Sequence, residues 1–176
     1  MNLSKKSLTI LVIILILLLL LTISVTVWAL FFRNSGAEPI PPDYLPQGTE
    51  ENQKPLENDQ SEKIESPGGG GAINVTYGTA ITVDLSENKV ALMYANPKAS
   101  NQNVALLITI GNLVVAKSDR IAPGYAVETL NLEAYAKERL SIGTYNGELV
   151  IRAYDPKTGE NAIVNTKGAI TVTVTA

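Results

Sequence analysis

The residues of this chain that are best suited to chemistry lie between Glu148 and Asn161. Glu148, Asp155 and Glu160 are carboxylates close together in sequence, with Arg152 among them, and a pair of carboxylates is what glycoside hydrolysis requires. The chain holds 17 acidic residues, so carboxylates on a solvated face become neighbours without any catalytic role. A carboxylate-based hydrolase is therefore the least favoured function.

The same stretch raises a second possibility, a calcium site. Its oxygen ligands would be Asp155, Thr158, Glu160 and Asn161. Calcium takes oxygen ligands of these kinds, but the spacing matches no recognised calcium-binding loop. The chain also has no His and no Cys, which removes imidazole and thiolate chemistry, disulfides and the usual zinc sites. We predict a non-enzymatic protein with no catalytic residue, no metal and no cofactor.

Composition divides the chain into four parts. They are a tail at 1–7, a transmembrane helix acting as a signal anchor at 8–32, a linker rich in Pro, Glu and Gly at 33–71, and a folded domain at 72–176. The domain carries nine acids and nine bases, so it lacks the basic field that nucleic-acid binding needs. We predict no nucleic-acid partner. A secreted eukaryotic domain of this size would often contain a disulfide, so the lack of Cys favours a bacterial surface protein.

The anchor is the stretch from Leu8 to Phe32, which runs 25 residues without a charge. As a helix it would span about 37 Å, against roughly 30 Å for the hydrocarbon core of a bilayer. Lys5 and Lys6 precede it and the chain turns acidic after Arg33. The positive-inside rule then predicts a cytoplasmic N-terminus and an extracellular C-terminal domain. The sequence thus indicates a single-pass protein of the cell membrane.

A cleaved signal peptide is the alternative for this segment. Possible cleavage sites are "VWA" at Val27–Ala29 and "SGA" at Ser35–Ala37. The apolar part of a signal peptide usually runs only about 7 to 15 residues, which favours the uncleaved anchor.

The linker contains six prolines, eight acids and four consecutive glycines. It has too few large apolar residues to offset the entropy of ordering the chain, so we expect a disordered spacer. A docking role for "PIPPDYLP", Pro39–Pro46, as a polyproline ligand is a less favoured alternative.

The domain consists of short runs rich in Val, Ile, Thr and Tyr that are separated by Gly, Asn and Pro. This pattern is typical of a β-sandwich or barrel, and we expect seven or eight strands. A break is expected near Gly78, as a bulge or a switch of sheet, and a bulge or second turn is expected at Thr166–Gly168. Gly111-Asn112 should join two strands in a type II′ hairpin.

Leu140, Gly143 and Tyr145 form the pattern "L-x-x-G-x-Y". This pattern resembles the tyrosine corner of immunoglobulin-like sandwiches, in which the Tyr hydroxyl bonds to the backbone upstream. The resemblance implies an all-β, Greek-key immunoglobulin-like sandwich, as in a bacterial membrane-anchored surface protein. Gly147 stands where antibody domains carry their second Cys. The matching motif covers only six residues.

The loop "YANPKASNQN", Tyr94 to Asn103, is the best candidate for binding. Its candidate residues are Tyr94, Asn96, Asn101 and Asn103, which combine adaptable hydrogen bonding with an aromatic anchor. A polar connection between sheets accounts for the same residues and is the favoured reading.

Two functions remain. The first is a membrane-anchored binding, adhesion or display module whose partner is an extracellular protein or glycan. The alternative is an accessory or structural subunit of a larger cell-envelope membrane complex, in which the helix is itself an interface.

Overall fold

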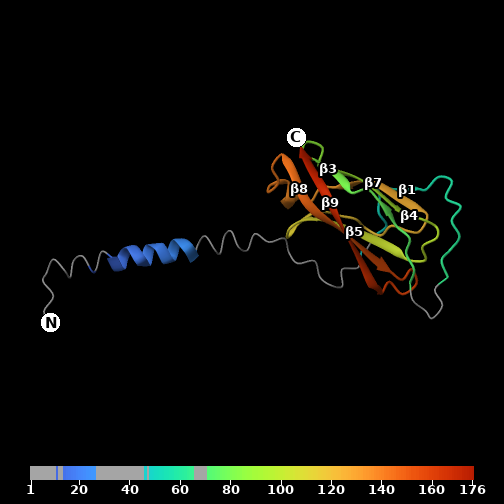
Figure 1. The fold of residues 1–176 in the computed structure, drawn as a ribbon, viewed down its shortest axis with the longest axis horizontal. Helices are drawn as coiled ribbons and strands as arrows, with labels where there is room; N and C mark the ends of the chain where they lie inside the picture. Colours follow the sequence, from blue (N-terminus) through green and yellow to red (C-terminus); the bar gives the residue numbers. More distant parts are fainter. Residues whose placement is uncertain (1–10, 12–13, 27–45, 47, 66–70) are drawn as a thin grey trace. The chain divides into compact units, whose positions relative to one another are not determined.

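The structure is a computed structural model that describes residue 11 and residues 14–26, 46, 48–65 and 71–176, with the backbone alone at 163 and 164. The chain divides into two compact units, Met1–Glu38 and Pro39–Ala176. Residues 14–26 of the first unit are helical, whereas the second unit is built mainly of β-strands (Figure 1).

The expected anchor, Leu8–Phe32, lies only in part within the described residues. No helix in that part of the chain is long and apolar enough to cross a membrane. The cytoplasmic tail and both possible cleavage sites lie outside the described residues, and so does "PIPPDYLP" except for Pro46.

The second unit contains nine strands and one short helix within its described residues. In chain order they are β1 (Gln53–Pro55), β2 (Thr76–Tyr77), β3 (Ala80–Asp84), β4 (Lys89–Asn96), β5 (Asn103–Ile110), β6 (Leu113–Lys117), β7 (Tyr125–Asn131), α2 (Ala134–Lys137), β8 (Gly143–Tyr154) and β9 (Asn161–Thr175).

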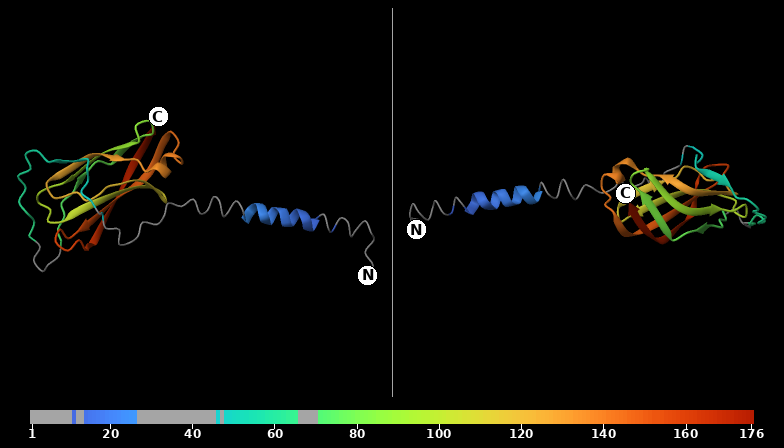
Figure 2. Two further views of the ribbon diagram at one scale, coloured as in Figure 1. Left: turned by 180° about the vertical axis from the view of Figure 1, so that it is seen from behind. Right: turned by 90° about the horizontal axis from the view of Figure 1, so that it is seen from above.

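The strands form a single sheet that curls around its own core. Their order is β1-β7-β4-β3-β9-β8-β5-β6, and β2 pairs with β4 beside this path. One half of the sheet contains β1, β7 and β4, and the other contains β9, β8, β5 and β6. Strand β3 connects the two halves, because it runs antiparallel to β4 and parallel to β9. Figure 2 shows the halves facing each other, an arrangement compatible with a β-sandwich.

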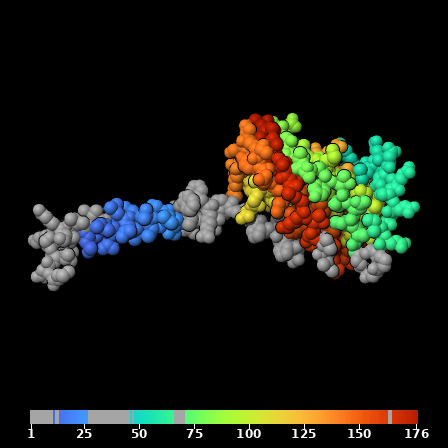
Figure 3. All heavy atoms as spheres, viewed as in Figure 1, coloured from blue at the N-terminus to red at the C-terminus, as the bar shows by residue number. Residues whose placement is uncertain are grey.

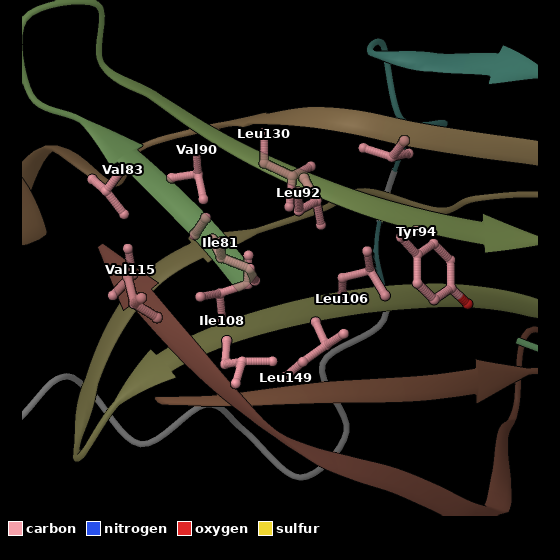
Figure 4. Packing of buried hydrophobic residues seen from close by; sticks show 14 of the residues in the cluster. Ile81, Val83, Val90, Leu92, Tyr94, Leu106, Ile108, Val115, Leu130 and Leu149 are labelled. Carbon is pink, nitrogen blue, oxygen red and sulfur yellow. The ribbon is translucent and has the colours of Figure 1, made fainter. Parts of the chain in front are cut away.

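Side chains along each strand point alternately to the two faces of the sheet, and this alternation explains which residues form the core. In β4 the side chains of Val90, Leu92 and Tyr94 are buried, whereas Met93 between them is 68% exposed. Figure 4 shows these buried residues of β4 packed with labelled residues from β3, β5, β6, β7 and β8. Residues of β9 belong to the same cluster. The sequence alone did not decide which face of β4 is buried, since both faces carry apolar residues.

Gly78 lies at the break that the sequence indicated, between β2 and β3, and both of these strands pair with β4 in one sheet, so the chain does not switch sheets there. Before it β2 pairs with β4 alone, and after it β3 pairs with both β4 and β9. The bulge expected at Thr166–Gly168 is wrong, because the β8–β9 register runs unbroken there and shifts only between Arg152 and Tyr154. Gly168 leaves room for the ring of Tyr77 instead.

Residues 48–65, which we call the docked segment, belong to the folded unit. Strand β1 pairs with β7, and Thr49 forms a parallel bridge with Arg120. Figure 3 shows the docked segment, in teal, against the green residues of the sheet. The expected disorder therefore does not hold for these residues, because hydrogen bonds along a strand edge stabilise them where apolar residues are few.

Candidate functional site

A hollow of about 500 Å³ at one end of the sheet is the candidate binding site. Four segments line it: Ser61 and Lys63 from the docked segment, Lys98, Ser100 and Asn101 from the β4–β5 loop, Pro123 before β7, and Pro156 after β8. Two lysines and no acid are among these residues. Loops on a rigid scaffold commonly carry binding sites, and this volume falls within the range of small-ligand pockets.

Lys98 is held in position from two sides. Its backbone N–H donates to Asp59 Oδ2 over 2.6 Å. Its side-chain stem lies against Gly124, with Cγ 3.0 Å from the place that a Cβ would take. Gly124 has a φ of +86°, which suits glycine. Glycine at this position therefore leaves a path for the lysine stem along the backbone.

Asp59 and Ser61 fix the docked segment to the β4–β5 loop. Asp59 accepts hydrogen bonds from the hydroxyl and N–H of Ser61 and from the N–H of Lys98. These bonds, that of the Ser61 hydroxyl first, hold the pKa of Asp59 below its usual 3.8. Ser61 Oγ accepts from the N–H of Ala99 over 3.0 Å, and the Ile64 N–H donates to the Ala99 carbonyl over 2.8 Å.

Residues on the far side of the loop are bound as firmly. The Asn101 N–H donates to the Ala72 carbonyl over 3.0 Å, and Asn101 Oδ1 accepts from the Ala72 N–H over 2.8 Å. Ser100 Oγ accepts from the Asn74 N–H and donates to the Asn74 carbonyl, each over 2.9 Å. The β4–β5 loop therefore binds its own chain on two sides.

The four residues proposed for this loop from sequence have different surroundings. Asn101 lines the hollow, and Asn103 lies in β5 opposite Tyr154. Asn96 is fully buried and donates through Nδ2 to the carbonyls of Gln102 and Ile121.

Tyr94 is 1% exposed, so it belongs to the core and is no surface anchor. Burial raises the pKa of its phenol. Its inward direction follows from sharing a strand face with Val90 and Leu92.

Tyr145 makes the contact that gives a tyrosine corner its name. Its hydroxyl donates to the Ser141 carbonyl, four residues upstream, over 2.9 Å. The ring lies over Gly143, with Cε2 3.7 Å from the place of a Cβ, and Leu140 packs half-buried against the core. These contacts explain the spacing of the three residues.

Gly147 has no space for a side chain. A Cβ there would lie 2.6 Å from the Thr109 carbonyl oxygen and 2.9 Å from Val172 Cγ2. The position that holds Cys in antibody domains is thus filled here by neighbouring strands.

The Gly111-Asn112 hairpin joins β5 to β6, with Ile110 paired to Leu113. Gly111 has a φ of +57° and Asn112 does not have a positive φ, as a type II′ turn requires.

Glu148 is too far from Asp155 to pair with it for glycoside hydrolysis. Glu148 and Asp155 are seven positions apart along β8 and its end, roughly 23 Å at about 3.3 Å per residue. Catalytic pairs lie about 5 to 10 Å apart. Glu148 lies instead 3.9 Å from Lys167.

Asp155 caps its own turn. Its Oδ1 accepts from the N–H groups of Thr158 and Lys157, and these bonds hold its pKa below the usual value. The Asp155 N–H donates to the carbonyl of Glu160, and Asn161 begins β9. The described part of the chain contains no group of three or more acidic side chains placed to hold a metal ion.

A second hollow, of about 320 Å³, lies where the docked segment meets β6 and the start of α2. Several of its charged groups bond within the protein. Glu50 is 6% exposed, and its carboxylate accepts from the N–H groups of Asn52 and Asp119. Lys117 lies 3.4 Å from Glu133. This hollow therefore lies along the contact between the docked segment and the sheet.

Sequence analysis did not find Ser61, Lys63 and Lys98 as site residues. One signal was present, since Asp59-Gln60-Ser61 and Asp84-Leu85-Ser86 share the pattern D-x-S. In both, the Asp carboxylate accepts from the Ser N–H and hydroxyl, the geometry of an Asx turn.

No protein-family model matches the chain, and no curated protein is similar to it in sequence. Among solved structures it is similar to AggA, the major subunit of aggregative adherence fimbriae type I from Escherichia coli. The TM-score is 0.33 at 11% identity, and the match covers 65% of this chain and 100% of that one. A likeness at this level carries no argument about function.

Proposed function

We propose that this protein is a non-enzymatic, membrane-anchored module that displays its domain outside the cell and binds an extracellular protein or glycan. The observation that carries the proposal is the hollow on which four segments of the chain converge. A rigid sheet holds these segments, as is common in binding domains.

The described helix supports the anchor. Large apolar side chains on every side of it are exposed, from Leu11 at 48% to Leu21 at 62%. A helix that is apolar all round needs apolar surroundings. The hydroxyls of Thr22 and Thr26 donate to carbonyls one turn earlier, so these polar groups are satisfied within the helix, as a bilayer demands.

For the domain we propose an immunoglobulin-like Greek-key arrangement. Two observations support it: the hydrogen bond from Tyr145 to Ser141, and the pairing of β3 with one strand of each half of the sheet. The absence of Cys supports a bacterial source.

The test is a cross-linking capture on intact cells with the full-length tagged protein. We expect capture of an extracellular protein or glycan that survives replacement of the anchor by an unrelated apolar helix. Lys98→Asp should abolish it. The control Lys167→Asp, on β9 beside Glu148, should not.

The opposite result would be that replacement of the native anchor abolishes capture while Lys98→Asp leaves it unchanged. That result would make the protein a subunit of a membrane complex. Turnover of any substrate by the purified protein would contradict the non-enzymatic proposal.

A further inference from the structure

We propose that the hollow binds an acidic oligosaccharide, and that the docked segment is a working part of this site, so that binding and docking reinforce each other. This inference rests on the proposed function, because it names the ligand class and the control of the same hollow.

The charges of the lining favour an anionic ligand. Lys63 and Lys98 bring two ammonium groups from different segments, and no carboxylate lines the hollow. The ion pairs found among the described residues involve other lysines, namely Lys54, Lys117 and Lys167. The ammonium groups at the hollow are therefore available to carboxylate or sulfate groups of a ligand.

The remaining lining favours a sugar over a protein. The side chains of Ser61, Ser100 and Asn101 are hydrogen-bonded within the chain. Contact with a ligand is therefore left to the two lysines and to the apolar surface of two prolines. Protein interfaces are usually centred on aromatic or other large side chains, and none lines this hollow. An oligosaccharide that carries carboxylate or sulfate groups suits two ammonium groups without such an anchor.

The acid nearest to Lys98 in the hydrogen-bond network is Asp59, and its carboxylate is bonded within the protein. Asp59 accepts from the backbone N–H of Lys98 and from the N–H and hydroxyl of Ser61. Both of its oxygens are therefore engaged in holding the docked segment on the loop. Asp59 acts as a positioning residue for Lys98.

The docked segment supplies one of the two lysines, so its docking completes the site. Detachment would remove Lys63 and Ser61 from the lining and would free the N–H groups of Lys98 and Ala99. A ligand that bridges Lys63 and Lys98 binds the docked state better. By linkage it must stabilise docking by the same factor by which docking strengthens binding. Part of the predicted linker thus forms part of the binding site.

The experiment uses the full chain in detergent micelles with fluorescein-labelled oligogalacturonate as the probe. Fluorescence anisotropy measures binding, and amide hydrogen exchange at Lys98 and Ala99 measures docking. The fully methyl-esterified oligosaccharide is the uncharged control. Lys54→Gln is the matched control for Lys63→Gln, because it removes the same charge from the same segment away from the hollow.

We expect the probe to slow exchange at Lys98 and Ala99 by about fivefold. Lys63→Gln should weaken binding by about tenfold and remove the slowing. Lys54→Gln should leave binding within about twofold, since it breaks only an exposed ion pair.

Binding without any change in exchange would overturn the coupling. Equal binding of the esterified form, or equal effects of the two lysine variants, would overturn the anionic class. If the probe does not bind, this ligand class is wrong, and capture on cells still decides whether the domain is a binding module.

Discussion

The core of the sheet and the docked segment are stabilised in different ways. Apolar side chains such as Val83, Val90 and Ile108, each at 0% exposure, fill the core. Short polar side chains and main-chain groups hold the docked segment, as in the hydrogen bonds of Glu50, Asp59 and Ser61. A segment can therefore be ordered on a folded domain without the apolar pattern that marks a core strand.

The largest effect is expected from Gly147→Ala in the core. The new Cβ would meet the Thr109 carbonyl oxygen at 2.6 Å, and backbone cannot rotate away as a side chain can. Overpacking of this kind should cost about 2 to 3 kcal/mol, measured by urea unfolding of the full chain in detergent. Gly78→Ala is the control, because its nearest neighbour would be Met93 Cβ at 3.4 Å. Equal losses for the two variants would contradict the packing described for Gly147.

Glu50→Ala should weaken docking by about 1 to 2 kcal/mol, because hydrogen bonds to a buried charged group are lost. The expected result is faster amide exchange at Asp119 and faster proteolysis of the docked segment, with core amides unchanged. Glu57→Ala, an exposed acid of the same segment, should have little effect. If core amides also exchange faster, the two regions unfold together and the comparison fails.

Tyr145→Phe should destabilise the domain by about 1 kcal/mol, the usual contribution of one hydrogen bond. The variant keeps the ring over Gly143 and loses only the bond to the Ser141 carbonyl. Thermal unfolding measures the change. An unaltered melting temperature would rule out a stabilising role for the corner.

The smallest effect is the acid dependence of docking through Asp59. Its pKa is held below 3.8 in the folded state, first by the Ser61 hydroxyl. A lowered pKa stabilises docking fully above pH 3.8, and this stabilisation is lost as the pH falls through the folded value. Amide exchange at Lys98 between pH 5 and about pH 3 should accelerate beyond the intrinsic pH trend. Asp59→Asn should lack this extra acceleration, and an unchanged profile would exclude Asp59 as its source.

Strand patterns and turn chemistry made much of the fold predictable. Gly111-Asn112 indicated the hairpin, and Gly78 indicated the break between β2 and β3. Both signals are local, because they depend on the backbone freedom of one or two residues.

The docked segment and the hollow could not be predicted in this way. β1 is only three residues long and ends at Pro55. Its partner β7 lies far away in sequence, since Lys54 and Glu128, which form an ion pair, are 74 residues apart. Short polar contacts over such separations leave no periodic pattern. Lys63 and Lys98 line one site because hydrogen bonds such as those of Asp59 and Ser61 hold the two segments together, and composition cannot reveal such bonds.

The most direct test of the account is disulfide trapping between the docked segment and β7. Lys54 and Ala126 are register partners, and the natural chain has no Cys to interfere. Cα atoms of such pairs lie about 5.5 Å apart, within the range of a disulfide. We predict rapid and nearly complete intramolecular bonding of Lys54→Cys with Ala126→Cys in the full chain, and little bonding of the out-of-register control, Lys54→Cys with Thr129→Cys. Equally slow bonding in both pairs, or bonding mainly between two chains, would contradict a segment docked on its own domain.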